Sequence, residues 1–395
     1  MNKIIVSCLI ITLVLVVFTG CKGSEAFYNE ETINNEVHVE EEENNRDEEK
    51  QILGKYKVPD EASEHEGTWL QWPHNNTYGE GYKEKLESIW IEMTKALSEG
   101  ENVHIVAYDE GEKDYINDLL INEGIDMSKI DFYIYPTDDV WARDNGPIFA
   151  YDNNQNLKIM DWGFNGWGKK VPYKKDRLLR DFIGKELGIE TIDLQDVVLE
   201  GGAIELDGKG TVLATRSAVT NKNRNPGLTE VEIEEYLREY YGVTNFIWLD
   251  GVAGVDITDF HIDGFAKFYD ESTIIILVEE DLIEWGVTDK DIEVLMNAKN
   301  AMGERYKYIY LPLTKKNVIL ESGKDLGYKG SYVNYYIGNT VVLVPNYNDP
   351  NDEVANEIIQ KLYPDRKVVG IDVRELYQYG GMIHCVTQQQ PVDLN

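Results

Sequence analysis

Strand-like and helix-like segments alternate along residues 52–395, and this alternation restricts the chain to a mixed α/β fold. Apolar residues recur at three- and four-residue spacing between Leu86 and Leu97, which is typical of one buried helix face. Runs such as 273–278 are rich in β-branched residues and are typical of strands. Since no linker rich in Pro, Gly or Ser interrupts the pattern after residue 52, we predict one α/β domain.

The expected elements follow from these periodicities. Helices are predicted near residues 86–97, 112–123, 174–187, 229–241, 289–305 and 350–363, and strands at 102–108, 131–135, 211–215, 273–278, 340–344 and 367–373. Thr229 and Glu232 form a capping-box pattern, and Asp349 with Pro350 predicts a helix N-cap followed by a first-turn proline. The sequence shows no internal repeat.

The first residues have the organisation of a secretory signal. Lys3 precedes an apolar run over residues 4–18, and two small residues lead to Cys21. The run is too short to span a membrane comfortably. We expect residues 1–20 to be a lipoprotein signal peptide and Cys21 to carry a lipid that anchors the protein on the extracellular face of a bacterial membrane. An ordinary signal peptide with a chance cysteine is the alternative.

An acidic segment follows the signal. Residues 22–51 contain eleven acidic and three basic residues and few residues that could build a core, so we interpret 21–51 as a disordered tether. The whole chain carries a formal net charge of −34. This charge argues against a nucleic-acid partner and is compatible with attraction of small cations, although solubility alone explains most of it.

Cysteine usage isolates one thiol. Cys8 leaves with the signal and Cys21 takes the lipid, so only Cys385 remains. A single cysteine in an exported domain has no disulfide partner within the chain, and it is either a buried small hydrophobic residue or a reactive group.

Four segments concentrate polar, glycine and aromatic residues where turns are expected: Trp141–Pro147, Glu200–Gly202, Asp256–Asp263 and Gly380–Cys385. Catalytic groups favour such loops on a rigid scaffold. Each segment is weak evidence alone, because an Arg-Asp pair, a Gly-Gly turn or a lone Cys usually has a structural cause.

Together these residue types suit attack on the central carbon of a guanidinium group. That cation is planar and always charged, so carboxylates can accept its paired N–H groups, and Asp144 and Asp263 are the candidates. A thiolate then adds to the carbon, ammonia leaves and water hydrolyses the amidino-cysteine, so one acid/base group serves both steps. His261 is the candidate for that group, with Glu200 orienting it or stabilising its charged form.

The motifs as a set resemble the agmatine deiminase / bacterial-type peptidylarginine deiminase family. The resemblance runs from about Tyr56 to Pro391, and its segments are 65–73, 141–147, 199–203, 221–226, 331–334, 349–352 and, most specifically, 380–391. It implies the pentein fold, a pseudo-fivefold α/β propeller of ββαβ units with the active site on its axis. It also implies a set of roles: nucleophile Cys385, acid/base group His261, guanidinium-binding Asp144 and Asp263, an acidic site residue Glu200, and a pocket wall against the methylene chain of the substrate, Trp141.

Other interpretations accompany these roles. Asp144 could merely pair with Arg143. His384 is interpreted as structural, because consecutive strand residues point to opposite faces, and His65 and His74 are interpreted as structural too. The loop at 221–226 is assigned to turn formation. No cofactor, metal site or phosphate-binding loop is expected, and the sequence does not give the oligomeric state.

The predicted function is hydrolytic deimination of a small cationic guanidino substrate. The leading candidate is agmatine, which would be converted to N-carbamoylputrescine and ammonia. Ile257 and Phe260 stand where agmatine-specific members typically have an acidic residue and a glycine, which puts recognition of the distal ammonium in question. Peptidylarginine deimination, with peptidyl arginine as substrate, is the alternative. Amidino transfer, a non-catalytic lipoprotein receptor and a papain-like hydrolase are weaker readings, and the last has its Cys and His in the opposite order.

Overall fold

The computed structural model describes residues 54–395, which form a mixed α/β fold as predicted. The predicted signal peptide (1–20), the tether (21–51) and Cys21 lie outside the described residues. Within the described part of the chain, none of the helices combines the length and apolar character needed to cross a bilayer.

Four of the five sheets repeat one connection, in which an antiparallel pair of strands is followed by a helical crossover to a parallel third strand. The strands are β5 (Ile148–Asp152), β6 (Leu157–Gly163) and β7 (Thr191–Val198); β8 (Ile204–Leu206), β9 (Thr211–Thr215) and β10 (Asn245–Leu249); β11 (Ala266–Asp270), β12 (Thr273–Leu277) and β13 (Lys307–Leu311); and β14 (Tyr336–Ile337), β15 (Val341–Asn346) and β16 (Lys367–Asp372). The short β1 (Tyr56–Lys57) extends the first of these sheets by pairing with β5. The structure therefore contains a repeat that the sequence did not show.

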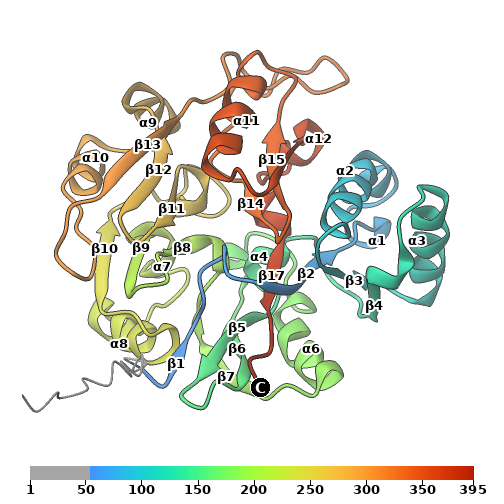
Figure 1. Ribbon diagram of the computed structural model, residues 1–395, viewed down its shortest axis with the longest axis horizontal. Coiled ribbons are helices and arrows are strands. Elements are labelled where there is room, and N and C mark those ends of the chain that lie inside the picture. The colour runs from blue at the N-terminus through green and yellow to red at the C-terminus, as the bar shows by residue number, and fades with distance from the viewer. Residues whose placement is uncertain (1–53) are drawn as a thin grey trace, which may run out of the picture. The chain divides into compact units, whose positions relative to one another are not determined.

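The fifth sheet joins the two ends of the domain. Its order is β17 (Gln388–Pro391), β2 (His65–Gln71), β3 (Asn102–Ala107) and β4 (Ile130–Ile134), with β17 antiparallel to β2. This pairing carries the segment just before β17, which contains Cys385, back to the start of the domain. Figure 1 shows the five sheets distributed around the middle of the domain, where the short α4 (Ala142–Asn145) lies.

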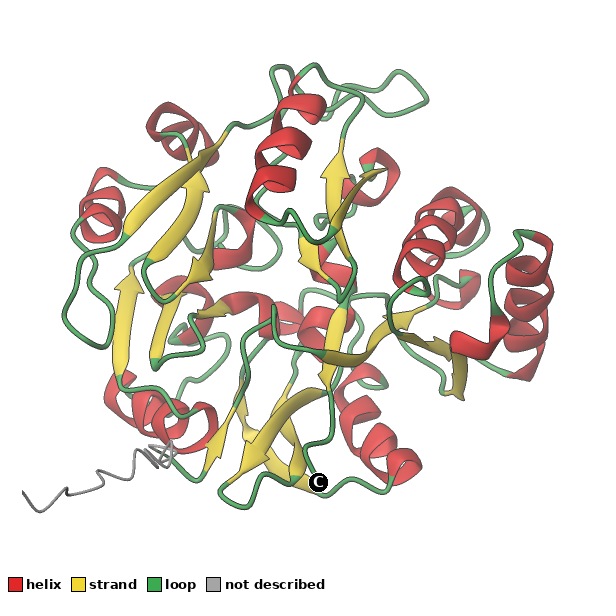
Figure 2. Ribbon diagram, viewed as in Figure 1, coloured by secondary structure: helices red, strands yellow, loops and turns green. Residues whose placement is uncertain are grey.

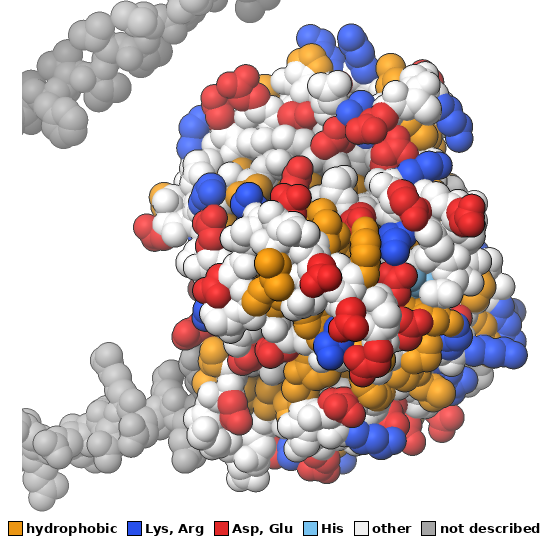
Figure 3. Space-filling view, turned by 90° about the vertical axis from the view of Figure 1, so that its right-hand side faces the viewer, with side chains coloured by type: hydrophobic (Ala, Val, Ile, Leu, Met, Phe, Trp, Pro, Cys, Tyr) orange, Lys and Arg blue, Asp and Glu red, His pale blue; other side chains and the backbone are white. Residues whose placement is uncertain are grey.

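The longer helices lie mainly on the periphery, outside the strands (Figure 2). They are α2 (Tyr82–Leu97), α3 (Glu110–Asn122), α6 (Leu179–Leu187), α8 (Glu230–Tyr241), α9 (Glu279–Trp285), α10 (Asp289–Met296) and α11 (Asn351–Leu362). Single turns form α1 (Asn75–Tyr78), α5 (Gly166–Lys169), α7 (Arg216–Val219) and α12 (Arg374–Tyr377). Charged side chains are scattered over the face in Figure 3, with hydrophobic side chains exposed between them.

Most predicted elements are present, and two helix ends differ. The capping box of Thr229 and Glu232 is formed at the start of α8. The helix predicted over 289–305 ends at Met296, because the Asn300 side chain accepts the amide N–H groups of residues 302 and 304 and turns the chain. The N-cap of α11 is Pro350 and not Asp349, whose carboxylate still accepts the amide N–H of Asn351.

A buried arginine fixes the central segment. Arg180 on α6 donates to the backbone carbonyls of Asp144, at 2.6 Å, and of Gly146, at 2.7 Å, as well as to that of Trp162. Its side chain is 1% exposed. Since buried carbonyl groups need a donor, this one guanidinium holds α4 against β6 and sets the position of the α4 backbone.

Candidate active site

One strand of each sheet, namely β5, β8, β11, β14 or β17, begins just after a short segment that carries a polar residue or the cysteine. Asp144 lies on α4 before β5, and Glu200 immediately precedes the turn η3 (Gly201–Ala203) before β8. His261 and Asp263 flank the start of η4 (Ile262–Gly264) before β11, and Cys385 lies in η5 (His384–Val386) before β17. The structure thus brings together the residues that the sequence analysis selected from four distant segments.

His261 lies between two carboxylates. Its Nε2 is 3.3 Å from Oε2 of Glu200, and its Nδ1 is 3.8 Å from Oδ2 of Asp144. Burial alone disfavours the charged ring, but Asp144 and Glu200 outweigh it and raise the pKa of His261 to about 9. The imidazole is therefore protonated near neutral pH and can act as an acid.

Asp144 faces the site and does not pair with Arg143, so the ion-pair interpretation is wrong. Its Oδ2 accepts from the Trp167 indole N–H at 2.8 Å, and its Oδ1 accepts from the amide of Gly202 at 3.0 Å. Arg143 instead donates to Gln389 and to the backbone carbonyl of His384. Burial, with neighbouring carboxylates, raises the pKa of Asp144 above its usual value.

Glu200 is held from the other side by Arg224. The Arg224 Nε donates to Oε1 of Glu200 at 2.6 Å, and its Nη1 reaches Asp259 at 2.8 Å. This cation and His261 outweigh burial and lower the pKa of Glu200. The predicted turn at 221–226 is present, since the Asn221 carbonyl accepts from the amide of Arg224, but the sequence analysis missed that the loop also supplies this buried cation.

Cys385 is half-buried, and its sulfur lies among polar groups. Its Sγ is 3.9 Å from Oδ2 of Asp263 and 3.5 Å from Nδ2 of Asn334. Burial, together with the Asp263 and Asp144 carboxylates, raises the pKa of the thiol well above its usual value. Asn334 belongs to the motif at 331–334, but no role was predicted for it from the sequence. It lies just before β14, as the other site residues lie just before β5, β8, β11 and β17.

Gly202 lies against the side chains of Asp144, His261 and Asp263. A methyl group on its Cα would lie 2.8 Å from Nδ1 of His261, 2.9 Å from Oδ2 of Asp263 and 3.0 Å from Oδ1 of Asp144. Any side chain here would push these groups apart. The Gly-Gly pattern therefore has a steric cause at the site itself.

Aromatic residues pack beside Asp144 at the site. Trp141 packs edge-on against Trp167 with ring centroids 6.1 Å apart, and a side chain on Gly381 would overlap the Trp141 ring. Ile257 lies near Gly380, because a Cβ on that glycine would be 3.2 Å from the Ile257 methyl. Phe260, in contrast, is 1% exposed and packs on Phe265.

Residues 57–391 match the family described as Porphyromonas-type peptidyl-arginine deiminase. The chain belongs to this family. A Latilactobacillus sakei protein named "Putative agmatine deiminase" is 32% identical over 362 residues, covering 85% of this chain and 96% of its own length. An Enterococcus faecalis agmatine deiminase structure is 28% identical, covers 86% of this chain and 97% of its own, and has a TM-score of 0.77. A cysteine-to-serine variant of the C. jejuni agmatine deiminase, determined with substrate bound, gives 28% identity, the same coverages and a TM-score of 0.74.

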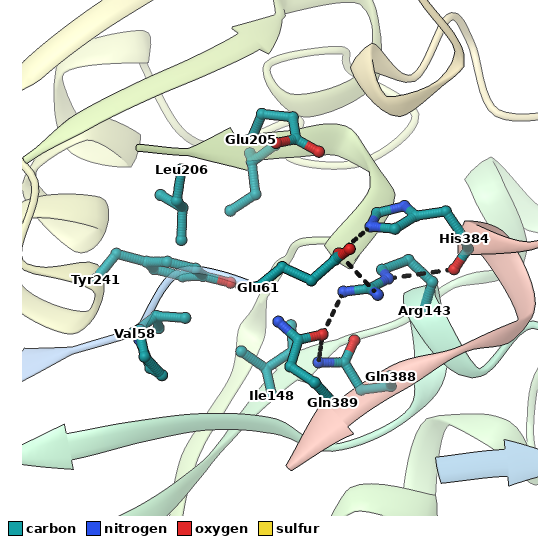
Figure 4. Close-up of a pocket in the computed structure, with 13 residues that line it drawn as sticks. Val58, Glu61, Arg143, Ile148, Glu205, Leu206, Tyr241, His384, Gln388 and Gln389 are labelled. Atoms are coloured by element: carbon teal, nitrogen blue, oxygen red, sulfur yellow. Dashed lines mark hydrogen bonds and ion pairs between the residues drawn. The ribbon is translucent and has the colours of Figure 1, made fainter. Parts of the chain in front are cut away.

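A cavity of about 60 Å³ adjoins the site in this family member (Figure 4). Its lining includes Arg143, Gly201 and His384, which immediately precede the site residues Asp144, Gly202 and Cys385 in the chain. His384 also contacts Asp263, so the cavity lies next to the site. Figure 4 also shows Glu61 in contact with His384 and Arg143.

The other histidines have separate outcomes. His65 contacts Glu101 and the Glu61 carbonyl, and His74 contacts Thr137 and caps α1, so both have structural partners. The argument made for His384 is wrong, because residues 384–386 form a helical turn and not a strand. Its ring contacts Asp263. Within residues 54–395, no cluster of three or more His, Cys, Asp or Glu side chains is arranged to hold a metal ion.

The thiol environment leads to a testable prediction. Replacing Asp263 with Asn removes a negative charge beside the sulfur, so the pKa of Cys385 should fall and the thiolate fraction at pH 7 should rise. Alkylation of Cys385 by iodoacetamide should then be faster than in the wild type, by about tenfold for each pKa unit.

The exposed Asp181→Asn change on α6 is the matched control and should leave the alkylation rate unaltered. An Asp263→Asn protein that is alkylated at the wild-type rate or more slowly would contradict the proposed effect of this carboxylate on the sulfur.

Proposed function

We propose that this chain hydrolyses agmatine to N-carbamoylputrescine and ammonia through a covalent intermediate on Cys385. The observation that carries the proposal is the convergence of two carboxylates, a protonated imidazole and a thiol around Gly202. Family membership and the agmatine deiminase names of similar proteins support it.

Asp144 and Asp263 bind the guanidinium in this mechanism. Both are buried, 3% and 4% exposed, and both carboxylates lie close to Gly202. A buried carboxylate interacts strongly with a planar cation that donates paired N–H groups. The bound cation also compensates the negative charge beside Cys385, so substrate binding itself favours loss of the thiol proton to solvent.

The two chemical steps use His261 in opposite senses. The sulfur bonds to the central guanidinium carbon, and protonated His261 gives its proton to the departing nitrogen, so ammonia leaves and an amidino-cysteine remains. Neutral His261 then takes a proton from water, whose oxygen bonds to the same carbon. The C–S bond breaks, and the ureido product and Cys385 are released.

The same proposal includes the fold and the location. Four ββαβ units and the fifth sheet, arranged around the site, would form a pentein propeller, and the N-terminal sequence supports export with a lipid on Cys21. A Cys21→Ser protein should lose metabolic palmitate labelling; retention of the label would contradict the lipid anchor.

Substrate choice is tested by measuring ureido product from agmatine, free arginine and a peptide ending in arginine. We expect turnover of agmatine to exceed that of the other two, with Ile257 packing on its methylene chain, and we expect none from Cys385→Ala or His261→Ala. Turnover of the peptide alone would replace this proposal with peptidylarginine deimination, and turnover of none would favour a receptor.

The charged state of His261 sets a pH dependence. Because its imidazolium must donate a proton, kcat/KM should fall as pH rises through the free-enzyme pKa of about 9. Glu200→Gln removes a group that raises this pKa, so the alkaline limb should move to lower pH. If the alkaline limb does not move in the Glu200→Gln protein, Glu200 does not raise the pKa of the group that acts as the acid.

A further inference from the structure

His384, the chain neighbour of Cys385, lies between two carboxylates. Its Nδ1 is 2.8 Å from Oδ2 of Asp263, and its Nε2 is 2.7 Å from Oε2 of Glu61. Ionised carboxylates only accept hydrogen bonds, so both ring nitrogens donate. The ring is 3% exposed and therefore has little freedom to turn away from either partner.

Glu61 is itself fixed from several elements. Its Oε1 accepts from the amide of Ile337 at 3.0 Å, and its Oε2 lies 3.2 Å from Nζ of Lys267 and 3.3 Å from Nη2 of Arg143. These cations and His384 overcome burial and hold the pKa of Glu61 well below its usual value. Glu61 is thus a charged group held by partners from several elements, and Figure 4 shows its contacts with His384 and Arg143.

The anchored ring determines where one oxygen of Asp263 lies. Oδ2 of Asp263 is the atom 3.9 Å from Sγ of Cys385 and 2.9 Å from the Cβ position of Gly202. Rotation of this carboxylate would change the plane in which a guanidinium is held relative to the sulfur. A misplacement of about 1 Å at such a point can cost about 100-fold in rate.

We propose that His384, anchored by Glu61, is a positioning residue that fixes the Asp263 carboxylate for attack by Cys385. The inference rests on the proposed deimination and adds a relay, Glu61 to His384 to Asp263, that reaches the site from the adjoining cavity. Glu61 and His384 both line that cavity.

Two substitutions separate the two halves of the relay. The amide nitrogen of His384→Asn takes the place of Nδ1 and can still donate to Asp263, whereas that of His384→Gln takes the place of Nε2 and reaches only Glu61. We expect kcat/KM to fall by less than about tenfold in the Asn protein and by about 100-fold in the Gln protein. Both lose one buried hydrogen bond, so their thermal unfolding midpoints should be similar.

A double-mutant cycle completes the test. If His384 acts through Asp263, His384→Gln should have little further effect on kcat/KM in an Asp263→Asn background. Equal activities of the Asn and Gln proteins, or additive losses in the cycle, would overturn the positioning role. The proposed function would stand in that case, provided that the wild-type protein turns over agmatine. Absence of wild-type turnover would instead remove the proposed function, so the two failures are distinguishable.

Discussion

Burying ionised carboxylates side by side is costly unless cations are buried with them, and this constraint organises the centre of the protein. Asp144, Glu200 and Asp263 are each at most 4% exposed. His261 contacts the first two, Arg224 pairs with Glu200, and His384 contacts Asp263. The cluster still raises the pKa of the nearby thiol. A guanidinium bound by Asp144 and Asp263 would place positive charge beside the sulfur and counter this effect of the carboxylates.

The fold meets this constraint by repetition. One strand of each sheet follows a short segment that contributes to the site, and the five segments contribute Asp144, Glu200, His261 with Asp263, Asn334 and Cys385. Rigid strands follow each segment, so small side-chain displacements are resisted. The closing pair of β17 and β2 matters most, because it positions Cys385, which lies just before β17.

Candidate site residues could be selected from the sequence where their chemistry is unusual in their segment. Cys385 was the one remaining thiol, and His261 and Asp263 lay in a turn rich in functional groups. Arg224 and Glu61 could not be predicted, because their importance comes from partners far along the chain: Glu61 contacts His384 across 323 positions. For His384 the argument was wrong, because strand alternation was assumed where the backbone forms a helical turn. The helical end at Met296 was missed because a side-chain turn at Asn300 overrode the apolar pattern.

The central claim is that Cys385 becomes covalently bonded to the guanidinium carbon. Acid quenching during turnover of agmatine, followed by mass spectrometry of the peptide containing Cys385, tests it most directly. We expect a modified peptide whose added mass equals that of agmatine less ammonia. The corresponding peptide of the Cys385→Ala protein should carry no added mass. Steady turnover with an unmodified Cys385 peptide under conditions that trap thioether and thiouronium adducts would contradict it.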